Sequence, residues 1–119
     1  GDERLMERVM SVVNKYMADP EFNVEMMARE VGLSRVQLHR KLKDITGVPA
    51  STFIRNLRMK KAAALLRERK LNIAEVADAV GFDNQANFST VFKKQYGVTP
   101  TEYIESAQDT SSFEGKETK

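Results

Sequence analysis

The sequence predicts an all-α protein of about seven helices, in which one long central helix joins two helix-turn-helix subdomains. Apolar residues recur at spacings of three and four along most of the chain, which is the period of an amphipathic helix. Two segments roughly 50 residues apart resemble each other, which indicates a duplicated unit. No stretch of useful length alternates apolar and polar residues as a strand does.

Helix start and stop signals divide the chain into five parts. The expected parts are a leading helix and turn at 1–22, a first helix-turn-helix at 23–48, a linker helix at 49–70, a second helix-turn-helix with a closing helix at 71–106, and a disordered tail at 107–119. The tail is polar and lacks helical periodicity, so its composition cannot support a packed core.

The leading helix is expected over residues 2–18 and should end at Asp19-Pro20, because the residue before a proline is pushed out of the helical region. Its apolar stripe consists of Leu5, Val9, Val12, Val13, Tyr16 and Met17. Methionines at helical spacing more often fill a core than form a sticky protein-binding surface. We therefore expect the methionines to seat the leading helix on the first unit: Met6, Met10, Met17, Met26 and Met27.

Capping residues mark the two helices of the first unit. Asn23 can cap a short helix over residues 24–31. Ser34 and Gln37 form a capping-box pattern that opens the following helix. The buried stripe of that helix is expected to be Leu38, Leu42 and Ile45.

The second unit repeats this pattern. Asn72 and Glu75 form a capping box for a helix over 73–80, and either Asp83 or Asn84 caps the next helix. The buried face of that next helix is expected to carry Phe88, Val91 and Phe92. A capping residue, a proline at the first helical position and a glutamate at the third then open a short closing helix at Thr99-Pro100-Thr101-Glu102.

The two units match each other in register. Each copy has a short helix, a glycine-containing turn and a second helix, which is the pattern of a helix-turn-helix. The alanine expected at a close helix approach is Ala28 in one copy and Ala77 in the other, and the turn glycines are Gly32 and Gly81. The alternative interpretation is an ordinary helical bundle with a duplicated hairpin.

Positive charge is concentrated in the middle of the chain. The whole chain has a net charge of +2, but segments 1–33, 34–70 and 71–119 carry −3, +9 and −4. A basic block in a helical protein suggests a polyanionic partner, although a solvated helix face gives the same pattern. The linker helix, from Pro49 as its first residue to about Arg69, would span about 31 Å. Successive major-groove faces on one side of B-DNA lie ~34 Å apart, so such a rod could hold two recognition helices over adjacent groove segments.

Several other function classes lack support. The chain has no cysteine, which excludes a disulfide framework, a thiolate zinc site and a cysteine nucleophile. His39 is the single histidine, and no spacing assembles a nucleophile, a base and an orienting acid, so neither an enzyme nor a cofactor is expected. No apolar run approaches ~18 residues and no signal-peptide pattern opens the chain. Because Gly1 is not a methionine, we expect a segment of a longer protein.

The most distinctive string of the chain lies in the second unit: Ile73-Ala74-Glu75-Val76-Ala77, Val80-Gly81-Phe82, Asn87-Phe88-Ser89, Phe92-Lys93-Lys94, Gly97 and Thr99-Pro100. Together with residues 34–42, this string resembles the DNA-binding domain of the AraC/XylS family of bacterial transcription regulators. The resemblance covers about residues 24–104. It implies sequence-specific binding to a double-stranded DNA operator, and a place in the bacterial cytoplasm.

The leading helix and the stretch Arg40-Lys41-Leu42-Lys43 with Thr46-Gly47 are similar to one subgroup of that family. Its members are the C-terminal output domains of hybrid two-component regulators, in which sensor, kinase and response-regulator parts share one chain. The alternative parent is a regulator with a sugar-binding domain. The family implies contact with RNA polymerase and a homodimer formed through parts outside this segment. The full-length parent can be anchored in the inner membrane, but no membrane contact is expected of this domain.

The first recognition helix is expected to carry most of the specificity. The residues that project outward near its beginning are Arg35, Val36, His39 and Arg40. The resemblance matches Val36, His39 and Arg40 to base-contacting positions. Arg40 can pair bidentately with guanine, His39 can hydrogen-bond a base edge, and Val36 can pack on a thymine methyl. The alternative interpretation of His39 is an exposed polar residue without a role in DNA binding. Phosphate contacts are expected from Ser34, Lys41 and Lys43.

The second recognition helix should read bases weakly or mainly hold the backbone. The resemblance matches Gln85, Ala86 and Thr90 to base-reading positions. However, Thr90 stands where an arginine is common in the family, and Ala86 is too small to hydrogen-bond, so Gln85 is the best base-contact candidate. The candidate phosphate contacts here are Asn87, Ser89 and Lys93. The linker helix adds Arg55, Arg58, Lys60 and Lys61, and about six neutralised phosphates would give a salt slope near −5.

Overall fold

The computed structural model describes residues 1–106 of the chain. Six helices have defined bounds: α1 (Asp2–Tyr16), α2 (Val24–Val31), α3 (Arg35–Thr46), α4 (Ala50–Glu68), α5 (Ile73–Ala79) and α6 (Gln85–Tyr96). A seventh helical segment occupies residues 100–106, and no strand occurs within the described residues. The predicted all-α class with about seven helices is thereby confirmed. The tail predicted at 107–119 lies outside the described residues.

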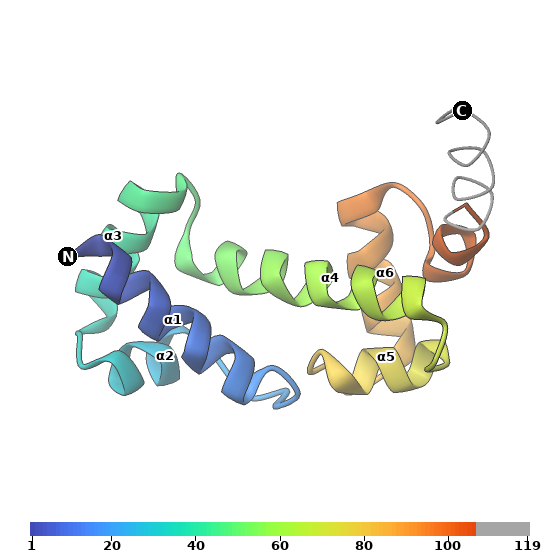
Figure 1. Cartoon of the computed structure of the whole chain (residues 1–119), viewed down its shortest axis with the longest axis horizontal. Helices are drawn as coiled ribbons and strands as arrows, with labels where there is room; N and C mark the ends of the chain where they lie inside the picture. The colour runs from blue at the N-terminus through green and yellow to red at the C-terminus, as the bar shows by residue number, and fades with distance from the viewer. Residues whose placement is uncertain (107–119) are drawn as a thin grey trace, which may run out of the picture.

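The helices form two groups at the two ends of α4 (Figure 1). One group contains α1, α2 and α3, and the other contains α5, α6 and the closing helical segment. The molecule is elongated, with principal extents of 48 × 35 × 22 Å. Helices α3 and α6 therefore lie well apart along the direction of α4.

Each group has its own hydrophobic core. The core of the first group consists of Val9, Val13, Phe22, Met27, Ala28, Val31, Leu38, Leu42, Ala50 and Ile54. The core of the second group consists of Met59, Ala62, Ala63, Leu66, Val76, Ala77, Val80, Phe88 and Phe92. Because α4 supplies residues to both cores, each group is anchored to the same helix. The side chain of Met17 packs against both cores.

The helices that have a side-chain cap begin where the sequence predicts, whereas three other predicted boundaries are displaced by one or two residues. Helix α1 ends at Tyr16 rather than at residue 18, with a turn before Pro20. Pro49 precedes α4 instead of being its first residue, because its ψ of 153° is extended. Helix α5 ends at Ala79, one residue earlier than expected. Such shifts change no packing face.

The methionines serve mainly as packing residues, as expected. Met27 is fully buried, and Met6, Met17 and Met26 pack against the first core. Met10 is the exception, since 36% of its surface is exposed. Helix α1 is also tied to α2 by the Arg8 guanidinium, which donates to the Val31 carbonyl at 2.6 Å. The leading helix is therefore an integral layer of the first group.

Two apolar residues differ from their predicted burial. Ile45 was expected in the buried stripe of α3, but it is 36% exposed and faces the hollow beside α1 that Met6 and Met10 also line. It lies in the last turn of α3, beyond the part of the helix that the core covers. Val91 is only partly buried against the second core. Among the described helices, none is long and apolar enough to cross a lipid bilayer.

Candidate nucleic-acid interface

One face of α3 combines exposure with positive charge. Val36, His39, Arg40 and Lys43 follow the i, i+3, i+4, i+7 spacing that places residues on one helical face. All four side chains are exposed, and Val36 exposes 65% of its surface, which is unusual for a valine. The opposite face is buried through Leu38 and Leu42. Burial of that face fixes the direction in which the exposed stripe points.

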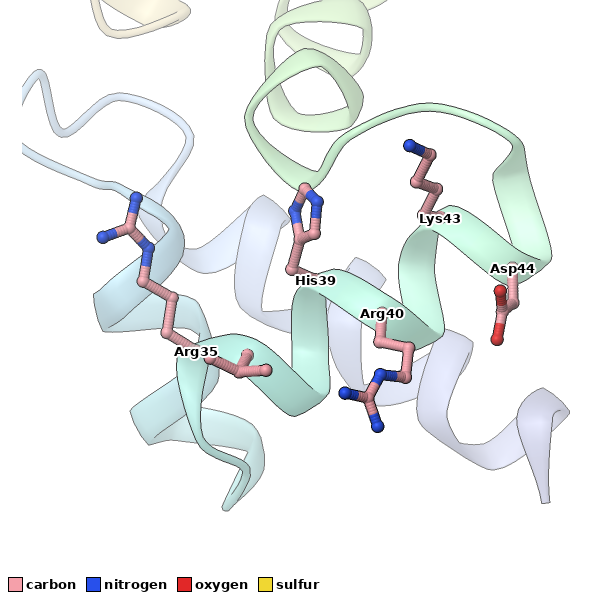
Figure 2. A pocket seen from close by; sticks show the side chains of 6 residues that line it. Arg35, His39, Arg40, Lys43 and Asp44 are labelled. Atoms are coloured by element: carbon pink, nitrogen blue, oxygen red, sulfur yellow. The ribbon is translucent and has the colours of Figure 1, made fainter.

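Figure 2 shows this stripe from close by. Arg35, Val36, His39, Arg40, Lys43 and Asp44 line a surface hollow along α3. His39 and Lys43 extend to one side of the helix, and Arg40 extends to the other. Such an arrangement places hydrogen-bond donors on both sides of the helix. The three cations of the hollow outnumber the single carboxylate of Asp44, so the site favours an anionic partner.

The beginning of α3 is held by a complete capping box. The Ser34 hydroxyl accepts a hydrogen bond from the Gln37 backbone N–H at 3.1 Å, and the Gln37 side chain accepts one from the Ser34 N–H at 3.0 Å. The predicted capping box is confirmed. It fixes the first turn of the helix, from which Arg35 and Val36 project. The hydroxyl of Ser34 is already engaged in this cap, and its O–H remains free to donate.

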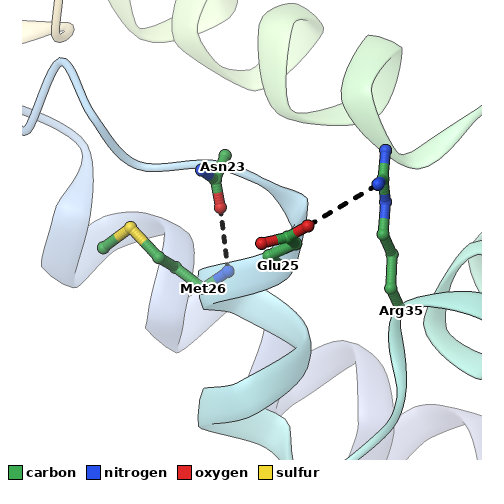
Figure 3. A network of polar contacts seen from close by, with 4 residues as sticks. All are labelled: Asn23, Glu25, Met26 and Arg35. Carbon is green, nitrogen blue, oxygen red and sulfur yellow. Dashed lines mark hydrogen bonds and ion pairs between the residues drawn. The ribbon is translucent and has the colours of Figure 1, made fainter.

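Arg35 lies beside the stripe and pairs with an acidic residue of α2. Its Nη1 lies 3.7 Å from Oε1 of Glu25, and Figure 3 shows the side chain reaching across to that carboxylate. Both side chains are about two-thirds exposed, at 68% and 63%. An exposed pair of this kind is worth less than about 1 kcal/mol, so a stronger anion can displace it. Glu25 has a position in the first turn of α2, which Asn23 caps by accepting from the Met26 N–H at 2.9 Å.

Helix α6 presents a stripe with little charge. Gln85, Ala86 and Thr90 are exposed, as are Asn87 and Lys93, while Ser89 is partly buried. Asn84, one of the two predicted caps, accepts from the Asn87 backbone N–H at 2.7 Å. The Thr90 hydroxyl donates to the Ala86 carbonyl at 3.0 Å, which occupies its one proton within the helix.

A cluster of rings holds α6 against α4 and the closing segment. The centroids of Phe92 and Tyr96 lie 4.6 Å apart, and those of Phe92 and Tyr103 lie 5.3 Å apart. Arg67 of α4 donates to the Tyr103 hydroxyl at 2.7 Å. The Tyr96 hydroxyl donates to the Met59 carbonyl, and burial raises the pKa of its phenol above the ordinary value, with Tyr103 adding to that effect. These contacts determine how the exposed stripe of α6 is presented.

The other predicted phosphate contacts are distributed over two helices. Lys41 and Lys43 are exposed on α3, and Arg55, Lys60 and Lys61 are exposed on α4. Lys60 and Lys61 also line a hollow between α1 and α4. The structure therefore leaves these five cations accessible to a polyanion.

Arg58 contradicts its predicted role as a phosphate contact. Only 8% of this residue is exposed. Its guanidinium donates to the Asp19 carbonyl at 2.8 Å through Nη2 and to the Gly81 carbonyl at 3.3 Å through Nη1. Burial lowers the pKa of this guanidinium from its ordinary value, and the nearby Asp19 carboxylate opposes that effect. A side chain so enclosed cannot reach a DNA backbone.

A signal for this burial is present in the sequence. Arg58 lies four residues after Ile54 and four before Ala62, so it stands on the apolar stripe of its own helix. Both of those residues are buried. Helical spacing therefore places Arg58 on the inner face, whereas its charge suggested the outer one. The sequence gives no such signal for two other partners, Glu25 for Arg35 and Asp19 for Arg58. Both pairs depend on tertiary packing.

Comparison with known proteins gives the family. The helix-turn-helix domain family matches residues 27–106. Histidine kinase P4 of Formosa agariphila is 36% identical over 102 residues, which cover 86% of this chain and 7% of that protein. The HTH-type transcriptional regulator MtrA of Neisseria gonorrhoeae is 34% identical over 86% of this chain and 33% of its own length. This chain thus spans a third or less of the length of these two relatives.

The solved structures agree with this assignment. The C-terminal domain of AraT, a response regulator from Geobacillus stearothermophilus, superimposes with a TM-score of 0.78 at 34% identity, over 86% of this chain and 84% of that one. Two helix-turn-helix units on one linking helix and an exposed basic recognition stripe fit the same assignment. The predicted AraC/XylS resemblance is confirmed, and the chain belongs to the AraC-type helix-turn-helix domains, the non-catalytic DNA-binding part of transcription regulators.

Proposed function

We propose that this chain binds double-stranded DNA sequence-specifically by placing α3 and α6 in adjacent segments of the major groove. The observation that carries the proposal is the exposed stripe of α3, where Val36, His39, Arg40 and Lys43 share one face of a capped helix. The 19 residues of α4 span about 28 Å, close to the ~34 Å between successive groove faces on one side of the duplex. A monomer can then contact two groove segments.

In this proposal, α3 reads the bases. Arg40 pairs with a guanine through O6 and N7, His39 hydrogen-bonds a neighbouring base edge, and Val36 packs on a thymine methyl. The 65% exposure of Val36 supports its role, since an apolar side chain gains from leaving water at the interface. Arg35 joins them when DNA displaces it from Glu25.

Helix α6 mainly positions the protein on the DNA and contributes less to base recognition. Gln85 is its base-reading residue, with Ala86 and Thr90 beside it. The Thr90 hydroxyl already donates within the helix, which supports a weak role in base recognition. Asn87 and Ser89, in the first half of the helix, and Lys93, in its last turn, hold phosphates. On α3 and α4 the proposed phosphate contacts are Ser34, Lys41, Lys43, Arg55 and Lys60.

The same proposal divides the chain into functional parts. Residues 23–48 and 71–106 are the two reading units, 49–70 is the spacer between them, and 1–22 is an added layer on the first unit. The parent protein is a two-component regulator of the cytoplasm, anchored in the inner membrane in the case of a membrane-bound sensor. It dimerises through other parts of its chain and contacts RNA polymerase at its operator.

Selection from random duplex DNA tests this proposal. The chain is incubated with the pool at low salt, and bound molecules are recovered and sequenced. We expect two enriched blocks whose centres lie about one helical turn apart. A single enriched block would restrict base reading to α3 and leave α6 as a backbone contact.

Two other outcomes contradict the proposal. Binding without enrichment would indicate a non-specific nucleic-acid protein. Absence of binding at low salt would favour a helical module for protein interaction, with Met10 and Ile45 at the centre of its surface. Repeating the selection with a dimer forced by a fused coiled coil separates a weak monomer from an inactive one, because bivalency raises apparent affinity.

A further inference from the structure

A buried arginine connects the two helix-turn-helix units at the middle of α4. The guanidinium of Arg58 donates to the carbonyl of Asp19, in the loop after α1, at 2.8 Å. It also donates to the carbonyl of Gly81, in the turn between α5 and α6, at 3.3 Å. These two carbonyls belong to different units, and Arg58 belongs to the helix that joins them. Figure 1 shows the end of α1 and the α5–α6 turn on the same side of α4.

Gly81 allows this close approach. A Cβ at this position would lie 2.7 Å from the Met17 carbonyl oxygen, and 2.8 Å from both Cζ and Nη1 of Arg58. Its φ of +82° adds a second reason for glycine. The turn glycine of the first unit, Gly32, has only an Arg8 side-chain atom nearby, at 3.8 Å. The tight packing is therefore specific to the turn of the second unit, where the two units touch.

The connection matters because α4 is otherwise the common support of two separate cores. A single helix of this length bends, and a bend at its middle would swing one recognition helix relative to the other. A second contact away from the helix axis resists both bending and twisting. Arg58 and Gly81, together with Met17 and Asp19 from the end of α1 and its loop, form that second contact.

The chemistry of Arg58 favours a role in orientation over a role in stability alone. A buried guanidinium is costly, and its Nε has no hydrogen-bond partner within the described residues. An apolar side chain could fill the same space without that cost. What the guanidinium adds is a planar fork that can donate to two carbonyls in fixed directions, which neither methionine nor lysine can reproduce.

We propose that Arg58 is a positioning residue that sets the orientation of α6 relative to α3, and thereby the spacing between the two DNA blocks that the chain accepts. The part concerning DNA rests on the two-unit binding proposed above. The relative orientation of α3 and α6 is a property of the free protein, so that part of the proposal does not depend on DNA binding.

The free protein tests the orientation. The chain has no cysteine, so Asp44→Cys on α3 and Gln95→Cys on α6, both exposed positions outside the proposed contacts, accept spin labels uniquely. Pulsed electron paramagnetic resonance then measures the distribution of distances between the two spin labels. We expect a narrow distance distribution for the unsubstituted chain and a broader or displaced one for Arg58→Met and Arg58→Lys. Arg55→Met, an exposed arginine on the same helix, is the matched control and should leave the distribution unchanged.

Arg58→Lys guards against a folding defect, because it retains the charge and the ability to donate hydrogen bonds while it lacks the planar fork. Circular dichroism of each variant verifies that helix content is retained before distances are compared. An unchanged narrow distribution in both folded Arg58 variants would overturn the proposal. That result would not depend on whether the chain binds DNA.

A series of DNA duplexes tests the consequence for spacing. Starting from the selected two-block site, base pairs are added or removed one at a time between the blocks, each rotating them by roughly 35°. The parent should lose about tenfold in affinity at a wrong spacing, whereas Arg58→Met should accept several spacings almost equally. A phosphate contact would act differently, lowering affinity at every spacing and reducing the salt slope by about one. A sharp spacing preference in Arg58→Met would also overturn the proposal, whereas a selection that yields one block would remove only the two-unit binding.

Discussion

Arg40 and Lys41 are neighbours on α3 with the same charge, and the structure separates them. Arg40 lines the hollow with Val36 and His39, whereas Lys41 does not. We predict that Arg40→Ala costs about 1–3 kcal/mol on the selected site and relaxes preference at one base pair, because a bidentate pair with guanine is lost. Lys41→Ala should weaken binding to all sequences about equally. Fluorescence anisotropy with the selected site and its single-base variants measures both effects.

The comparison between these two variants decides the assignment. If Arg40→Ala weakened all sequences uniformly, Arg40 would be a phosphate contact and base reading by α3 would depend on His39 and Val36. Preference relaxed by Lys41→Ala instead would mean that the helix is rotated in the groove relative to the proposal.

Glu25 competes with DNA for Arg35. The two side chains lie 3.7 Å apart and both are exposed, so breaking the pair costs less than about 1 kcal/mol. We predict that Glu25→Gln raises affinity about two- to fivefold at low salt, with the gain shrinking as salt screens the pair. Glu30→Gln removes the same charge from an exposed position of the same helix and serves as control. Equal gains in both variants would mean that net charge, rather than release of Arg35, explains the effect.

Individual residues show where prediction from sequence succeeds and where it ends. Capping residues such as Ser34 and Asn72 were predictable because a cap and its helix are close in sequence. Arg58 was predicted to be an exposed phosphate contact and is buried, because the prediction gave its charge more weight than its place on an apolar stripe. The predicted burial of Ile45 was wrong for the opposite reason. Its place on the apolar stripe was right, but the core does not cover this residue in the last turn of α3.

At the scale of elements, the two recognition helices share a pattern and differ in surroundings. The sequence repeat predicted both helices, and both turn glycines, Gly32 and Gly81, have a positive φ. The difference between them comes from neighbours. Helix α3 is covered by α2 and α4, whereas α6 is held by a ring cluster that includes Tyr103 from the closing segment. Those ring contacts join residues far apart in sequence, so no local pattern predicts them.

The ring cluster predicts a dependence of stability on alkaline pH. The pKa of Tyr96 is raised in the folded protein by burial and by Tyr103, so the unfolded chain loses this proton first, near the ordinary value of 10.0. The stabilising contribution of Tyr96 is present below that value and is lost as pH rises through the folded pKa. Tyr96→Phe retains the ring without the proton. Thermal melts from about pH 9 to 11 should show a smaller loss of Tm for the variant.

Melts at pH 7 provide the reference for this comparison, because they isolate the loss of the hydrogen bond from the Tyr96 hydroxyl to the Met59 carbonyl. An alkaline loss of Tm as large in Tyr96→Phe as in the parent would assign the effect to other groups.

At the scale of the whole molecule, two small cores share one helix. Neither unit is large, and each depends on α4 for part of its core. The length of α4 could be read from the sequence, and it supports contacts one helical turn apart. The relative rotation of the units could not be read, because it depends on the junction of Arg58, Met17 and Gly81. That junction joins three segments through backbone carbonyls, which leave no mark on side-chain patterns.

The distribution of charge over the whole molecule predicts how binding responds to salt. The phosphate contacts proposed above include five exposed side-chain cations: Lys41, Lys43, Arg55, Lys60 and Lys93. Each neutralised phosphate contributes about −0.9 to the slope of log affinity against log salt, so we expect a slope between about −4 and −5 on the two-block site. A duplex that carries only the first block should give a slope shallower by about one, because Lys93 of α6 loses its phosphate. Equal slopes on both duplexes would place the second unit off the DNA, and a slope near zero would remove the electrostatic basis of binding altogether.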